Sequence, residues 1–128
     1  MKGGIMKKIL IVDDSLFMRM VLKGILSKME GEYETLEADS GTKALELLKR
    51  VKPDLVLLDV IMPEGEEEGV RVLQIIMKND PESKVVMITA VGQDPVVEQC
   101  KKLGAKDYII KPFEEGQVIE TVRKALGD

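Results

Sequence analysis

Residues 55–58 constrain the fold of this chain more than any other stretch, because they are apolar without alternation. The run reads Leu-Val-Leu-Leu and is followed directly by Asp59. A strand that helices cover on both faces has this pattern, which is typical of parallel sheets. In open parallel sheets, ligands bind outside the carboxyl ends of the strands. We therefore expect Asp59 to lie on a rigid element at the rim of a functional cleft.

Apolar runs and helical patterns alternate along the rest of the chain. Strands are predicted at 8–12, 33–38, 55–59, 84–89 and 107–111, and helices at 15–29, 41–51, 69–78, 95–103 and 115–126. Strict alternation predicts right-handed crossovers, and therefore one parallel sheet with helices on both faces. The length suits a single domain spanning 1–128 without an output domain, and we expect 1–7 to form a short flexible segment.

Composition and charge exclude several classes of function. A net charge of −4 argues against a nucleic-acid partner, which needs a basic patch, and no apolar run is long enough for a membrane helix. Cys100 is the single cysteine and forms no intrachain disulfide, so we expect a cytoplasmic protein. The chain has no histidine, which excludes a histidine base, a histidine metal ligand and a phosphohistidine of its own.

Chemically active side chains stand at the predicted carboxyl ends of four strands. Asp13 and Asp14 follow the first strand, while Asp59 ends the third, Thr89 the fourth and Lys111 the fifth. Parallel strands point the same way, so we expect these residues to meet at one rim. Three carboxylates at one rim repel one another unless a cation joins them. Carboxylate oxygens are hard ligands, and they favour Mg²⁺ or Mn²⁺ as this cation.

This set of side chains suits phosphoryl transfer, which needs mainly positioning and charge stabilisation. We expect Asp59 to act as the nucleophile and to form an aspartyl phosphate. Thr89 can hydrogen-bond one phosphoryl oxygen, and Lys111 can neutralise another as a point charge. Each residue alone has an ordinary explanation, as a helix cap or the end of a strand. The prediction depends on their joint placement.

The chain closely resembles the receiver domain of two-component response regulators, the CheY-like family. The matching segments are 11–15 (Ile-Val-Asp-Asp-Ser), 59–63 (Asp-Val-Ile-Met-Pro), 89–90 (Thr-Ala) and 111–113 (Lys-Pro-Phe). The resemblance covers nearly the whole chain from Lys8 onward. It implies a flavodoxin-like α/β fold, with five helices around a five-stranded parallel sheet in the order 2-1-3-4-5.

The resemblance also implies how the phosphoryl group arrives. Asp59 would accept it from the phosphohistidine of a histidine kinase or a phosphotransfer protein, which explains why this chain needs no histidine. Asp13 and Asp14, together with Asp59 and the backbone carbonyl of Ile61, would bind Mg²⁺. The chain would then be a stand-alone regulator with a downstream partner that the sequence does not identify, although chemotaxis-type regulators have a similar pattern.

A conformational switch is implied as well. Thr89 and Lys111 would contact the phosphoryl group, and the family usually has a cis peptide bond at Lys111–Pro112. Tyr108 matches the aromatic switch position, where it would turn inward as Thr89 moves toward the phosphoryl oxygen. The face formed by the fourth helix, the fifth strand and the fifth helix would then change for a partner.

The sequence departs from the family pattern in two places. Segment 64–68 (Glu-Gly-Glu-Glu-Glu) precedes Gly69, where the family reaches a glycine sooner. We interpret this as a two-residue insertion in the loop after the third strand, and we expect the three glutamates at 66–68 to form a solvated helix start. Alternatively, these glutamates alter metal affinity or repel an acidic partner. Ile61 and Val91 are both apolar and flank the path of an attacking water in the family. We therefore predict slow self-dephosphorylation.

Three other classes of function compete with this interpretation. A haloacid-dehalogenase-type phosphatase needs a second Asp two residues after the nucleophile, where this chain has Ile61. A nucleotide-binding or flavodoxin-like module needs a glycine-rich phosphate loop after the first strand, and this chain has none there. A receiver-like scaffold that works without phosphorylation would be expected to lack an acidic or lysine position, and none is lost.

Overall fold

A five-stranded parallel sheet in the order β2-β1-β3-β4-β5 forms the centre of the molecule, as the sequence predicts. The computed structural model describes residues 6–65, 67–90 and 94–127. The strands are β1 (Lys7–Val12), β2 (Tyr33–Ala38), β3 (Leu55–Leu58), β4 (Val85–Thr89) and β5 (Asp107–Ile110). The helices are α1 (Leu16–Leu26), α2 (Gly41–Leu48), α3 (Glu68–Asn79), α4 (Asp94–Leu103) and α5 (Glu115–Leu126).

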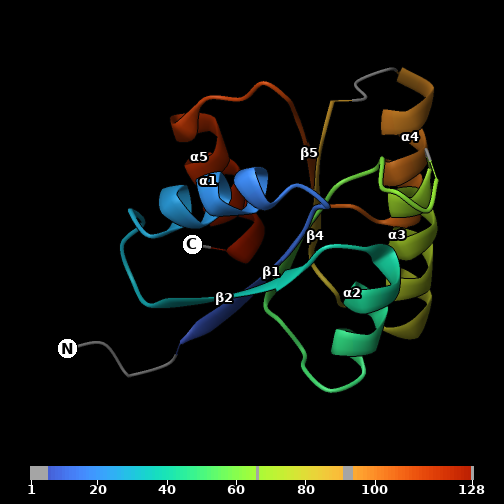
Figure 1. The fold of residues 1–128 in the computed structure, drawn as a ribbon, viewed down its shortest axis with the longest axis horizontal. Helices are drawn as coiled ribbons and strands as arrows, with labels where there is room; N and C mark the ends of the chain where they lie inside the picture. Colours follow the sequence, from blue (N-terminus) through green and yellow to red (C-terminus); the bar gives the residue numbers. More distant parts are fainter. Residues whose placement is uncertain (1–5, 66, 91–93, 128) are drawn as a thin grey trace.

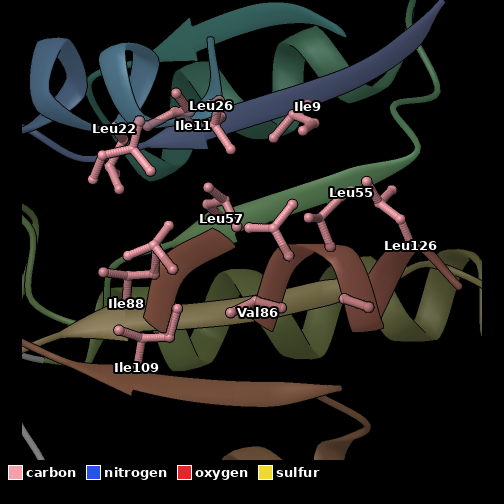
Figure 2. Packing of buried hydrophobic residues seen from close by; sticks show 14 of the residues in the cluster. Ile9, Ile11, Leu22, Leu26, Leu55, Leu57, Val86, Ile88, Ile109 and Leu126 are labelled. Atoms are coloured by element: carbon pink, nitrogen blue, oxygen red, sulfur yellow. The ribbon is translucent and has the colours of Figure 1, made fainter. Parts of the chain in front are cut away.

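Helices cover both faces of the sheet. Helices α1 and α5 pack on one face, and α2, α3 and α4 pack on the other (Figure 1). Alternate residues of each strand enter opposite layers, so Ile9 and Ile11 join the layer under α1 and α5 while Leu10 and Val12 join the other. Figure 2 shows the first of these layers, where side chains of both helices interdigitate with four strands. The apolar run in β3 is unbroken because helices bury both faces of the sheet at this strand.

Serine caps fix the starts of the first two helices. The Ser15 side chain accepts a hydrogen bond from the backbone N–H of Met18, and Ser40 caps α2 in the same way. Both helices end three residues earlier than predicted. In α1, the Ser27 hydroxyl donates to the Gly24 carbonyl and the last turn tightens. In α2, the N–H of Lys49 donates to the Glu46 carbonyl, three residues back, so the helix tightens into a turn there.

Four strand boundaries also differ from those that we predicted, and the first of these is the end of β3, at Leu58 rather than at Asp59. Strand β1 already begins at Lys7, so the predicted flexible segment 1–7 overlaps it by one residue; residues 1–5 lie outside the described part of the chain. Strand β4 begins at Val85 rather than at residue 84. Strand β5 ends at Ile110, so Lys111 follows the strand instead of ending it. None of the described helices is long and apolar enough to span a membrane.

The start of α3 corrects our prediction for segment 64–68. Glu68 belongs to the helix and is only 7% exposed, instead of being solvated. Its carboxylate forms two hydrogen bonds with Arg71, at 2.9 and 2.7 Å, and lies against Gly41 of α2. Glu67 is exposed as expected, and Glu66 lies outside the described residues.

Gly69 brings α3 close to the end of β3. Its backbone N–H donates to the carbonyl of Val60 at 2.8 Å. A Cβ at this position would overlap the carbonyl oxygen of Asp59, so only glycine allows this approach. The backbone of Asp59 is therefore held by the helix that follows it as well as by the sheet.

Candidate functional site

Three carboxylates meet at the carboxyl edge of the sheet. One oxygen each from Asp13, Asp14 and Asp59 lies within 4.8 Å of the others. Asp13 and Asp59 are buried, whereas Asp14 is exposed. The cluster therefore has a closed inner side and an open outer side, with Asp14 on the open side.

Hydrogen bonds restrain Asp13 at its backbone and at both carboxylate oxygens. Its backbone N–H donates to the Ala38 carbonyl at 3.1 Å, which ties it to the neighbouring strand β2. Its carboxylate accepts one hydrogen bond from the Ser15 N–H at 2.9 Å and another from Lys111 Nζ at 2.9 Å. The side chain has little freedom to move, which is what a pre-organised ligand requires.

Asp59 is equally restrained at the end of β3. Its N–H donates to the Val12 carbonyl at 3.1 Å, and its Oδ1 accepts from the Ile61 N–H at 3.3 Å. Burial raises the pKa of its carboxyl above the ordinary 3.8, and the charge of Asp13 acts in the same direction. The charge of Lys111 and hydrogen bonds from Thr89 and Lys111 oppose this rise without cancelling it.

Lys111 links the two buried carboxylates. Its Nζ lies 2.9 Å from Asp13 Oδ2 and 3.2 Å from Asp59 Oδ2. Burial, the largest single influence, lowers the pKa of this ammonium. The hydrogen bond with Asp13 and the charges of both carboxylates outweigh burial, so the pKa ends above the ordinary 10.5 and the group stays charged. The Lys111–Pro112 peptide bond is cis, as the family resemblance implies.

Thr89 and Tyr108 occupy neighbouring strands beside the cluster. Thr89 is fully buried, and its carbonyl accepts from the Lys111 N–H at 2.8 Å. Tyr108 pairs with Met87, two residues before the Thr89–Ile110 pair, and packs into the layer under α4. Burial raises its pKa to about 12, and Cys100 and Asp59 add smaller effects in the same direction. Tyr108 is therefore close enough to the cluster to experience its charge.

The residues predicted to flank the path of water are only partly described. Ile61 is 41% exposed beside Asp59, so an apolar side chain borders the outer side of the site. Val91, the other predicted flanking residue, lies outside the described residues. Sequence reasoning missed Arg19, whose Nη1 donates to the backbone carbonyl of Asp13 at 2.7 Å.

The donor set suits a small, hard divalent cation. All three side chains offer carboxylate oxygens, the ligand type that Mg²⁺ and Mn²⁺ prefer, and no soft ligand stands among them. Lys111 reaches the inner oxygens of Asp13 and Asp59. A cation and an ammonium can thus share the negative charge between them.

Comparison with known proteins assigns the class. Residues 9–123 match the family model of the response regulator receiver domain, so this chain belongs to that family. Receiver domains of this kind are signalling phosphoacceptors rather than enzymes.

The similarity extends to particular relatives. The chain is 44% identical over 119 residues to the chemotaxis protein CheY of Thermotoga maritima, covering 92% of this chain and 96% of that protein. It also superposes on the CheY of a CheX–CheY–BeF₃–Mg²⁺ complex from Borrelia burgdorferi, with a TM-score of 0.86, 31% identity and coverage of 95% and 90%. In NtrX from Brucella abortus (TM-score 0.84, 35% identity, 95% of this chain), the match spans only 28% of the longer chain.

Proposed function

We propose that this chain is a stand-alone response regulator that accepts a phosphoryl group on Asp59 from the phosphohistidine of a histidine kinase or phosphotransfer protein. The observation that carries the proposal is the position of Asp59, buried at the rim among two further carboxylates and a lysine. The nearly complete coverage of the Thermotoga CheY supports a single-domain regulator. We place the reaction in the cytoplasm, as expected from the sequence.

In the proposed reaction, an oxygen of the Asp59 carboxylate attacks the phosphorus of the donor. An O–P bond forms, the P–N bond breaks and the imidazole leaves as a neutral ring once it has gained a proton. The ionised carboxylate is the nucleophile, and the Lys111 ammonium favours that form even though burial opposes it. Thr89 would donate to one phosphoryl oxygen while Lys111 neutralises another.

Asp13 and Asp14, with Asp59 and the backbone carbonyl of Ile61, are the proposed ligands of Mg²⁺ (or Mn²⁺). When bound, the cation would offset the negative charge that the carboxylates and the transferring group bring together. The Mg²⁺ named in the Borrelia complex supports this assignment. The restraint of Asp13 and Asp59 by backbone hydrogen bonds also supports it, because little reorganisation would be needed on binding.

Phosphorylation would be read out at the surface of α4, β5 and α5. Thr89 would move toward the phosphoryl oxygen and Tyr108 would settle inward. Tyr108 lies on β5, which pairs directly with the strand β4 that ends in Thr89, and this adjacency supports a coupling between the site and this tyrosine. We propose a protein as the downstream partner, without nucleic acid or membrane. A role in chemotaxis is supported by the similarity to CheY proteins, and CheX in the Borrelia complex illustrates such a partner.

The test is phosphorylation by acetyl phosphate with Mg²⁺, followed by intact-mass measurement. The native protein should gain one phosphoryl group, and Asp59→Asn should gain none. Asp54→Asn is a matched control, because Asp54 precedes the same strand at its other end and is exposed. Phosphorylation of Asp59→Asn to the native extent, or failure of the native and control proteins to react, would refute the proposal.

A further inference from the structure

Arg19 joins three segments of the chain near the carboxylate cluster. Its Nη1 donates to the backbone carbonyl of Asp13 at 2.7 Å, and its Nε donates to Glu37 Oε1 at 2.7 Å. The Arg19 side chain is only 13% exposed, although it carries a charge. A largely buried, doubly hydrogen-bonded guanidinium has a defined geometry, unlike a solvated surface arginine.

The carbonyl that Arg19 contacts belongs to the peptide that joins Asp13 to Asp14. The Asp13 carboxylate has other restraints, from Ser15 and Lys111. Within the described part of the chain, no hydrogen bond holds the exposed Asp14 carboxylate. Its direction therefore depends on the orientation of this peptide, which Arg19 fixes.

Glu37 anchors the guanidinium to the sheet. It lies on β2 and also pairs with Lys23, at 3.0 Å. Hydrogen bonds from Arg19 and then Lys23 hold the pKa of Glu37 below its ordinary 4.5, so the anchor stays ionised at neutral pH. The next residue of β2, Ala38, accepts the N–H of Asp13. Strand β2 thus holds the Asp13 backbone directly at its nitrogen and through Arg19 at its oxygen.

We propose that Arg19 is a positioning residue for the divalent cation: clamped by Glu37, it orients the Asp13–Asp14 peptide so that the Asp14 carboxylate faces the cluster. This inference rests on the proposed function, because it takes Asp14 as a cation ligand. In this role a positively charged side chain strengthens cation binding, whereas its charge alone would weaken it.

The sign of the effect separates positioning from charge. An arginine that acted only through its charge would repel Mg²⁺, so its removal would tighten binding. An arginine that orients a ligand favours binding, so its removal weakens binding by about tenfold or more, the cost of losing a group that orients a metal ligand. Lys23 lies on the same helix and also contacts Glu37. Lys23→Gln removes the same charge but leaves the hydrogen bond from Arg19 to the Asp13 carbonyl in place.

The experiment is Mg²⁺ titration by calorimetry on the native protein, Arg19→Gln, Arg19→Lys, Lys23→Gln and Asp59→Asn. Thermal unfolding of each in EDTA accompanies it. We expect weaker binding in Arg19→Gln, and also in Arg19→Lys, because one ammonium cannot span Glu37 and the Asp13 carbonyl as the fork does. Lys23→Gln should stay within about twofold of native, since exposed pairs contribute little. The Asp14 amide NMR signal should shift in both Arg19 variants and not in Lys23→Gln.

Each outcome decides the question. Native or tighter Mg²⁺ binding by Arg19→Gln overturns the inference, as does an equal weakening in Lys23→Gln. A lower unfolding temperature with an unchanged Kd shows a purely structural role and also overturns it. If Arg19→Gln does not fold, Arg19→Lys carries the same comparison. Two outcomes would instead refute the proposed cation site itself: the native protein does not bind Mg²⁺, or Asp59→Asn binds Mg²⁺ as well as the native protein does.

Discussion

The ammonium of Lys111 lies 3.2 Å from a carboxylate oxygen of Asp59, the proposed phosphoacceptor, and thus serves as its counter-charge before any cation arrives. Lys111→Gln leaves the buried Asp59 and Asp13 without this partner. We expect the free energy of unfolding without Mg²⁺ to fall by about 3 kcal/mol, because breaking a buried ion pair leaves uncompensated charge. Mg²⁺ should bind Lys111→Gln more tightly and recover much of that loss.

Urea unfolding with and without Mg²⁺ measures both effects. Lys106→Gln is the control, since it removes the same charge from an exposed residue just before β5. It should change the free energy of unfolding by no more than about 0.5 kcal/mol. Equal stabilisation of native protein and Lys111→Gln by Mg²⁺ would contradict the prediction.

The contribution of Glu68 to the free energy of unfolding depends on pH. The hydrogen bond from Arg71 holds the pKa of Glu68 below its ordinary 4.5 in the folded state. A carboxyl with a lowered pKa stabilises the fold above the unfolded value, and this contribution disappears as the pH falls through the folded value. Glu68→Gln should therefore lower the free energy of unfolding by about 1 kcal/mol at neutral pH and have a smaller effect at a pH well below the ordinary 4.5.

Urea titrations of Glu68→Gln at the two pH values test this, with Glu67→Gln as an exposed neighbour for comparison. A loss of stability of the same size at both pH values would show that packing against Gly41, rather than the charge, explains the effect.

Gly69→Ala tests the close approach of α3 to the acceptor. The new Cβ would collide with the Asp59 carbonyl, so either the helix or the strand end must move. We expect a loss of about 2 kcal/mol in stability, as for other overpacked sites, together with weaker Mg²⁺ binding. Gly116→Ala is the matched control in α5, where a Cβ meets nothing within 4 Å. That variant should be as stable as the native protein or slightly more so; unchanged stability in Gly69→Ala would refute the argument.

Ile61 should slow the loss of the phosphoryl group. Its exposed apolar side chain cannot orient a water for attack on the aspartyl phosphate. Ile61→Asn supplies a hydrogen-bonding group at that place, and one net hydrogen bond of about 1 kcal/mol corresponds to roughly fivefold faster hydrolysis. The decay of phosphorylated protein after removal of the donor measures the rate. Native decay within seconds, or no change in Ile61→Asn, would disprove the prediction.

The sequence was enough to predict the sheet and the rim because both depend on local patterns. The apolar run before Asp59 shows a doubly covered strand, and strict alternation with helices fixes the direction of its neighbours. Once the strands are parallel, Asp13, Asp59 and Lys111 must lie at the same edge. Their contacts follow from the fold, without any signal from the spacing itself.

The sequence did not predict the contacts between segments that are distant along the chain. Glu68 reads as one of several surface glutamates, and its burial depends on Gly41 of another helix, where no side chain occupies the space. Arg19 sits among Met18 and Met20 in a stretch that mixes core and surface residues, and only the placement of β2 brings Glu37 beside it. Helix ends were also misplaced, because the final turn depends on single hydrogen bonds such as that of Ser27.

The ion pair between Lys111 and Asp13 joins positions that lie 98 residues apart. A chain emerging from the ribosome reaches Asp13 early and Asp59 midway, yet it completes the pocket only after the fifth strand has been made and docked. Copies truncated before Lys111 therefore lack this ion pair, and half-folded copies have not yet formed it. The complete set of charged groups at the rim is thus present only in molecules whose synthesis and folding are complete.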